Sequence, residues 1–173
     1  KLHWALIFSL VIIFTISIGI FIFYKNDKTV WITDNDFLYD KAVTYIVNQN
    51  TVNGYDKDKN DYKVFADYNG FGIEEKGNKK YVYMWILEES YYVENNKLES
   101  SQGISTLYKF TFVNDEVVGY ETPEDGSLYT SSMKKMLPDS IENEVFSFEM
   151  SDIKLKEQVK EYYSYLESAE GDL

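Results

Sequence analysis

The stretch KKYVYMWILEESYYVEN, residues 79–95, decides the fold of this chain. It is rich in β-branched and aromatic residues, which predicts a long β-strand. A Gly77-Asn78 pair comes directly before it and is typical of a tight hairpin turn. We therefore expect this strand to pair antiparallel with the preceding segments YKVFADY and GFGIEE, residues 62–68 and 70–75.

Further strands are predicted after residue 95. The segment 95–105 is polar and predicts a loop, whereas LYKFTF, residues 107–112, alternates aromatic with polar residues as a half-buried strand does. An Asn114-Asp115 turn leads into the segment EVVGYET, and Pro123 together with Asp125-Gly126 ends the sheet. The prediction is a four-stranded antiparallel meander.

A helix is predicted before the meander. Thr33 is a good N-cap residue, and Asp34 and Asp36 follow it in the first turn, where the helix dipole favours carboxylates. Apolar residues at helical spacing continue this helix to about Asn48, and a polar, glycine-containing loop is expected over residues 50–61.

Helices are also predicted after the meander, over residues 131–137 and 139–146 and from Ser151-Asp152 onward. The last helix carries one apolar stripe, formed by Leu155, Val159, Tyr162 and Leu166. A helix, an antiparallel meander and helices packed on it make an α+β fold. We see no internal repeat and expect one domain over residues 34–173.

The N-terminal segment 2–24, LHWALIFSLVIIFTISIGIFIFY, carries no formal charge. As a helix it reaches roughly 34 Å, enough to cross a hydrocarbon core of about 30 Å. A cleaved signal peptide is the alternative, but its apolar core is shorter and ends in small residues, whereas this run ends in FIFYKNDK. We expect a single-pass transmembrane anchor over residues 1–25 in contact with membrane lipid, a juxtamembrane linker over 26–33, and the α+β domain outside the cytoplasm.

Composition limits the function classes. The chain has a formal net charge of −12, no cysteine and no arginine. Without arginine to hold phosphate, an acidic chain is not expected to bind nucleic acid. The absence of cysteine suits an extracytoplasmic domain on a Gram-positive bacterial surface.

The residue types also limit catalysis. The only histidine, His3, lies in the predicted membrane helix, which removes histidine-based triads and ordinary zinc sites. Ser-x-x-Lys pairs occur from Ser131 and Ser132 to Lys134 and Lys135, and again from Ser151 to Lys154. No partner motif accompanies them, and capped, solvated helices explain them as well. Glu88 and Glu89 are adjacent in a strand, so they point to opposite faces and cannot form a catalytic pair. We expect both on the surface, and no enzyme.

One segment has the spacing of a calcium loop. Asp56, Asp58 and Asn60 stand at alternate positions, and Asp67 follows at the twelfth, as in loops that wrap a calcium ion. However, Asp61 occupies the position that needs glycine for the sharp turn, and Asp67 falls in a predicted strand. A polar loop of alternating charges is the simpler interpretation, and no other cofactor is expected.

The aromatic residues of the central strand allow two interpretations. Their side chains could line a ligand groove, or they could build core and cross-strand pairs, as such strands more often do. The residues concerned are Tyr81, Tyr83, Trp85, Tyr91 and Tyr92.

The region from Phe65 to Pro138 resembles the C-terminal extracytoplasmic region of some clostridial membrane proteins of the BlaR/MecR-type antirepressor metallopeptidase family. In those proteins a tyrosine-rich strand precedes a segment of the form Y-x-x-P-x-D-G-x-x-Y-x-x-x-[IM]-[KR]-x-x-[FL]-P. The matching residues are Tyr120, Pro123, Asp125, Gly126, Tyr129, Met133, Lys134, Leu137 and Pro138. The H-E-x-x-H motif of the family's peptidase is absent from the chain.

The resemblance implies a last transmembrane helix followed by a sensory or regulatory domain, either cut from a longer regulator or encoded alone. A protein partner or a membrane peptidase region would then receive its signal. The alternative is a stand-alone surface binding protein, such as an inhibitor or an envelope-complex subunit.

Overall fold

A computed structural model of the chain describes residues 30–32 and 35–166. The elements follow one another as β1 (Val30–Ile32), α2 (Asp36–Asn53), β2 (Lys63–Lys76), β3 (Lys79–Glu94), β4 (Lys97–Val113), β5 (Glu116–Glu121), the short 3-10 helix η1 (Gly126–Leu128), α3 (Tyr129–Met136), α4 (Asp139–Ser147) and α5 (Ile153–Tyr162). The predicted anchor lies outside these residues. None of the described helices is long and apolar enough to cross a membrane.

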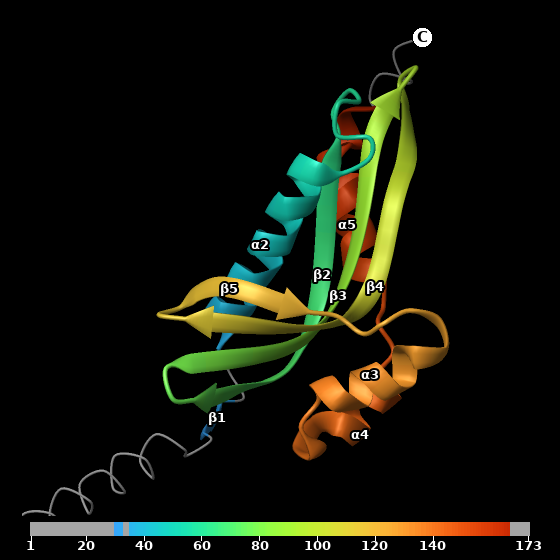
Figure 1. Ribbon diagram of the computed structural model, residues 1–173. Coiled ribbons are helices and arrows are strands. Elements are labelled where there is room, and N and C mark those ends of the chain that lie inside the picture. Colours follow the sequence, from blue (N-terminus) through green and yellow to red (C-terminus); the bar gives the residue numbers. More distant parts are fainter. Residues whose placement is uncertain (1–29, 33–34, 167–173) are drawn as a thin grey trace, which may run out of the picture.

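The five strands form one antiparallel sheet in the order β1-β2-β3-β4-β5 (Figure 1). The α+β class is therefore confirmed, but the prediction of four strands is wrong. Residues 30–32, assigned to the linker, form β1 and pair with β2. Trp31 stabilises this edge strand because its ring packs on that of Tyr83, with the centroids 6.2 Å apart. Gly72 makes room for the indole, since a Cβ there would come within 3.2 Å of it.

Two-residue turns join the long strands. Gly77 and the Asn114-Asp115 pair have positive φ, as predicted for tight hairpins. A third turn of this kind, at Asn95-Asn96, was not predicted, with φ of 54° and 61°. The loop expected over residues 95–105 is wrong, because β4 begins at Lys97 and pairs with β3 along this segment. Its side chains are mostly exposed there, so the segment lacks the apolar alternation that marks a half-buried strand.

Helices cover both faces of the sheet (Figure 1). α2 packs on the face that carries the even-numbered residues of β3, with Leu38, Ala42 and Ile46 buried against Met84 and other core side chains. α3 and α4 pack on the opposite face around Tyr83 and Leu107. α5 packs on this same face farther along β3, around Phe65 and Val93.

Two helix predictions need correction. α2 begins at Asp36 rather than directly after Thr33, because the side chain of Asn35 accepts a hydrogen bond from the backbone N–H of Leu38 and caps the helix there. In α5, Leu155 and Val159 are buried as predicted, but Tyr163 is buried in place of Tyr162. The hydroxyl of Tyr163 donates a 2.8 Å hydrogen bond to the carbonyl oxygen of Asp61, which holds this ring against the sheet.

Candidate functional site

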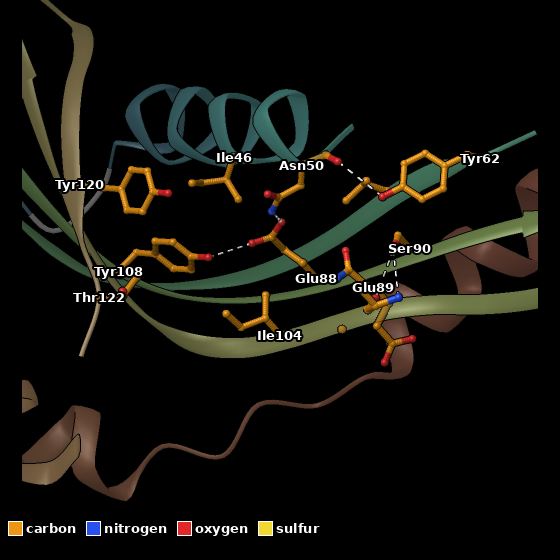
Figure 2. Close-up of a pocket in the computed structure, with 13 residues that line it drawn as sticks. Ile46, Asn50, Tyr62, Glu88, Glu89, Ser90, Ile104, Tyr108, Tyr120 and Thr122 are labelled. Atoms are coloured by element: carbon orange, nitrogen blue, oxygen red, sulfur yellow. Dashed lines mark hydrogen bonds between the residues drawn. The ribbon is translucent and has the colours of Figure 1, made fainter. Parts of the chain in front are cut away.

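A pocket of about 420 Å³ lies between the C-terminal half of α2 and the sheet (Figure 2). Helix α2 contributes Ile46 and Asn50, and the central strands contribute Glu88 and its neighbours. The chain that leaves β5 closes one side. The full lining is Ile46, Asn50, Tyr62, Val64, Glu88, Glu89, Ser90, Gln102, Gly103, Ile104, Tyr108, Tyr120 and Thr122.

Glu88 is the central polar group of this pocket. Its side chain points toward α2 and is held between two donors (Figure 2). The amide of Asn50 donates to Oε2 over 2.6 Å, and the hydroxyl of Tyr108 donates to Oε1 over 3.0 Å. Glu88 is only 2% exposed, so the expectation of a surface residue is wrong. Glu88 comes directly after the apolar row of β3, and α2 extends far enough to cover it.

The regular spacing of two elements brings Glu88 and Asn50 together. On β3, Glu88 follows Val82, Met84 and Ile86 at every second position, so it lies on the face packed against α2. On α2, the half-buried Asn50 follows Ile46 by four residues and lies on the same side of the helix as the buried stripe. Each apolar row therefore ends in a polar residue at the same end of the core. This coincidence of two rows is the signal by which the sequence could have revealed the site.

Burial raises the pKa of the Glu88 carboxyl above its ordinary value. The hydrogen bonds from Asn50 and Tyr108 oppose this shift, because they stabilise the carboxylate, but burial outweighs them. No lysine lines the pocket. The pKa of Tyr108 is raised as well, first by burial and then by the charge of Glu88. The pocket thus holds an acid whose charged form is stabilised by neutral donors alone.

This arrangement can accept a positively charged or hydrogen-bonding group. A cation that enters the pocket would lie near the carboxylate of Glu88, which has no positively charged partner among the lining residues. Tyr108 and Tyr120 lie on the same side of the pocket and direct their hydroxyl groups into it, where they can hydrogen-bond to such a group. The pocket has no second acid placed to share a proton. Glu89 also lines the pocket, but its carboxylate points to the opposite face of β3, where it accepts a hydrogen bond from the hydroxyl of Tyr91.

The structure does not bring the calcium candidates together. Within the described residues no three histidine, cysteine or acidic side chains form a group that could hold a metal ion. The carboxylate of Asp56 instead accepts a 2.6 Å hydrogen bond from Ser101. Asp58 and Asn60 lie in the turns that follow α2, and Asp67 lies within β2, opposite Leu87 of β3.

The serines and lysines of the Ser-x-x-Lys candidates in α3 contact other residues instead of one another. The hydroxyls of Ser131 and Ser132 donate to the carbonyl oxygen of Leu128, and Ser132 also accepts from the backbone N–H of Glu124. The ammonium of Lys134 pairs with Glu142 of α4 over 3.2 Å. These bonds run from serines inside α3 back to a carbonyl oxygen and do not cap the helix, which has no side-chain capping bond at its start. Ser132 is also buried, so the interpretation as a capped, solvated helix is wrong here. In the third candidate, the Ser151 hydroxyl accepts from the N–H of Ile153.

The signature residues have recognisable places in the fold. Tyr120 packs its ring near Tyr108 and Phe110 and lines the pocket. Pro123 is buried and follows the end of β5 by two residues. Gly126 begins η1 with a φ of 69°, which a residue with a side chain rarely adopts.

The remaining signature residues belong to the helices that follow. Asp125 precedes η1 and makes no side-chain capping bond there. Tyr129 begins α3 and packs against the core under α3 and α4, and Pro138 stands between these two helices.

The aromatic residues of β3 build core, as the simpler interpretation predicted. Tyr83 is 2% exposed, and Tyr81 and Trp85 pack against the cluster under α3 and α4. Tyr91 packs with the cluster under α5. Tyr92 lies beside the ammonium of Lys59, 5.3 Å from its ring centroid.

Comparison with known proteins finds no match among protein-family models, curated proteins or solved structures.

Proposed function

We propose that this chain is a membrane-anchored, extracytoplasmic sensory or interaction domain without catalytic activity, and that it binds a positively charged amine in the pocket under α2. The observation that carries the proposal is the carboxyl group of Glu88. It is almost fully buried, yet it lines a pocket, and its hydrogen-bond partners within residues 30–32 and 35–166 are Asn50 and Tyr108, both of them neutral.

The electrostatics of the pocket favour an amine over other ligands. An ammonium group would satisfy the carboxylate of Glu88 directly and strengthen its charged form. The hydroxyl groups of Tyr108 and Tyr120 add hydrogen-bond acceptors for the ammonium N–H groups. The net charge of −12 attracts cations to the domain and repels anions.

The placement at a membrane rests on the uncharged apolar segment 2–24 and on the resemblance to membrane-bound regulators. A single helix that precedes β1 in the chain would transmit the effect of ligand binding from the domain to the membrane. Protease added to intact cells tests this placement. It should remove the domain while leaving the anchor segment in the membrane fraction, and full protection in intact cells would contradict it.

A second candidate is a stand-alone binding protein, such as an inhibitor or an envelope-complex subunit. One helix followed by an antiparallel sheet that packs around it is an order similar to cystatin-like folds, and this supports the candidate by analogy of fold alone. Co-purification of a stoichiometric partner without any peptidase would favour it.

Calorimetry tests amine binding directly. The full chain in nanodiscs of zwitterionic lipid is titrated at low salt with n-butylammonium chloride and with 1-butanol, which has the same number of heavy atoms. Empty nanodiscs supply the background. We expect n-butylammonium to bind at least tenfold more tightly, and Glu88→Gln to remove this preference.

The matched control is Glu144→Gln, which neutralises an exposed acid on α4 away from the pocket. It should keep the preference for the amine. Equal binding of the two probes to the unaltered chain, or an undiminished preference in Glu88→Gln, would overturn the proposal.

A further inference from the structure

β4 is much longer than the strand beside it. β5 pairs only with the residues from Lys109 to Val113. From Lys97 to Tyr108, β4 has β3 as its one partner strand among the described residues, so its other edge is unpaired. Figure 1 shows this part of β4 at the margin of the sheet.

The side chains along the unpaired edge are largely exposed, and the turn after α2 contacts Ser101 and Gln102 through Asp56 and the backbone N–H of Tyr55. Eight of the nine residues in Lys97–Ser105 are exposed, and the ninth, Ser101, is half-buried. The segment contains no proline, and its one lysine stands at its first position. Proteins commonly protect free edges with such residues, because an open row of N–H and C=O groups pairs readily with another strand.

The chain itself turns away from this edge just where the pocket opens. After β5, Thr122 lines the pocket and Pro123 is buried, so the chain does not continue beside β4. Gln102, Gly103 and Ile104 belong both to the free edge and to the pocket lining. The position that a further strand would take therefore lies next to the pocket that holds Glu88.

We propose that an extended peptide segment adds to the sheet beside the end of this free edge, residues 101–105, and places a lysine side chain in the pocket against Glu88. The inference rests on the proposed amine binding and names the kind of molecule that carries the amine. Main-chain hydrogen bonds to an exposed edge provide affinity in this mode, and a pocket for one side chain provides specificity.

The register of the sheet supports the placement of the lysine. Ile104 is the partner of Glu88 in the β3–β4 pairing, and it lies on the face toward α2. A guest residue beside Ile104 would be two strand spacings from Glu88, roughly 10 Å between backbones. Extended lysine and glutamate side chains together span such a distance. The shift in register near Ser90 makes the edge irregular beyond this point, so we expect a short guest strand.

The charge of the domain agrees with this partner. A chain with a net charge of −12 and a buried carboxyl in the adjoining pocket favours a basic segment. A second copy of this acidic chain would bring like charges together at the same edge. We therefore assign the edge to a lysine-containing partner segment.

The test uses capped peptides and the full chain in zwitterionic nanodiscs. The probe is acetyl-Thr-Val-Lys-Val-Thr-amide, and the reference is acetyl-lysine-amide. Two N-methylated forms of the peptide are compared. One carries methyl groups on the backbone nitrogens of both valines, and the other carries them on the backbone nitrogens of the lysine and the last threonine. Alternate N–H groups of a strand point to opposite edges, so only one form loses the hydrogen bonds to β4.

We expect the peptide to bind at least tenfold more tightly than acetyl-lysine-amide. One N-methylated form should lose this gain, and the other should keep it. Replacement of the peptide lysine by norleucine, or Glu88→Gln in the protein, should weaken binding at least tenfold, whereas Glu144→Gln should not.

The possible failures are distinguishable. If acetyl-lysine-amide binds through Glu88 but the peptide gains nothing, or both N-methylated forms behave alike, the strand addition is overturned and the amine pocket stands. If neither probe binds, the proposed function fails as well. A dimer of the chain alone in analytical ultracentrifugation that the peptide does not dissociate would assign the edge to a second copy and overturn the inference.

Discussion

The hydroxyl of Tyr108 donates a 3.0 Å hydrogen bond to the carboxyl of Glu88, across two neighbouring strands of the sheet. Both side chains are almost fully buried, with exposed fractions of 4% and 2%. Burial raises the pKa of both groups. The pair therefore links the stability of the domain, its response to pH and the properties of its pocket.

Glu88 should make the folded state less stable as pH rises. Its pKa in the folded state lies above the ordinary value of 4.5, so between these two pKa values the folded state binds more protons than the unfolded state. The free energy of unfolding then falls with rising pH, by at most about 1.4 kcal/mol per pH unit for one proton. Glu88→Gln should remove this contribution. Urea unfolding at several pH values measures it, and an unchanged slope in Glu88→Gln relative to Glu144→Gln would contradict it.

Tyr108→Phe should raise the pKa of Glu88 further. The tyrosine hydroxyl stabilises the carboxylate, and its loss leaves Asn50 as the one remaining donor among the hydrogen bonds described for this carboxyl. We expect a loss of about 1–3 kcal/mol in stability at neutral pH, because a buried carboxylate loses a partner. Carbon-13 NMR of the Glu88 carboxyl follows the titration. Tyr120→Phe removes a hydroxyl from the same pocket and should leave the Glu88 titration in place.

Gly70→Ala should destabilise the fold. A Cβ at this position would come within 2.3 Å of the buried ring of Tyr39, which packs between α2 and the sheet. Overpacking of this kind costs about 1–3 kcal/mol. Gly119→Ala is the matched control, since a Cβ there meets no atom within 4 Å. Thermal unfolding compares the two, and equal midpoints would show that Tyr39 moves aside without cost.

Leu155→Ala should destabilise the domain by about 2–5 kcal/mol, because Leu155 belongs to α5 and its side chain is fully buried in the core between this helix and the sheet. Ile153→Ala, in the same helix but 64% exposed, should change stability by less than about 0.5 kcal/mol. Denaturant unfolding measures both. A small effect of Leu155→Ala would mean that α5 contributes little to the cooperative core.

Glu88 shows how far the sequence reaches toward the candidate site. Strand alternation correctly separated Glu88 and Glu89 onto opposite faces. The error was to treat both faces as equally exposed at this point. Whether a strand residue is buried depends on what packs against it, and α2 extends to Asn53, beyond the end near Asn48 that its apolar pattern indicated. The extra turn brings Asn50 over Glu88 and covers the carboxyl.

The strand β4 shows how far sequence patterns could predict the fold. Its second half was predicted because Phe110 and Phe112 alternate with polar residues over a packed face. Its first half was missed, because a strand with one partner and exposed side chains needs no such pattern. The Asn95-Asn96 turn, with positive φ at both residues, was the local signal that could have indicated it.

The sequence by itself determined the α+β class, the hairpins at Gly77-Asn78 and Asn114-Asp115, and the apolar stripe through Leu155 and Val159. Each of these follows from turn chemistry or from periodicity over a few residues, which are local properties. Only the tertiary structure decided that Asn50, Glu88 and Tyr108 meet in one pocket and that β4 extends past β5 with a free edge. These features depend on the lengths and registers of elements distant in the chain, because burial and pairing are set by the neighbour that a residue meets in space.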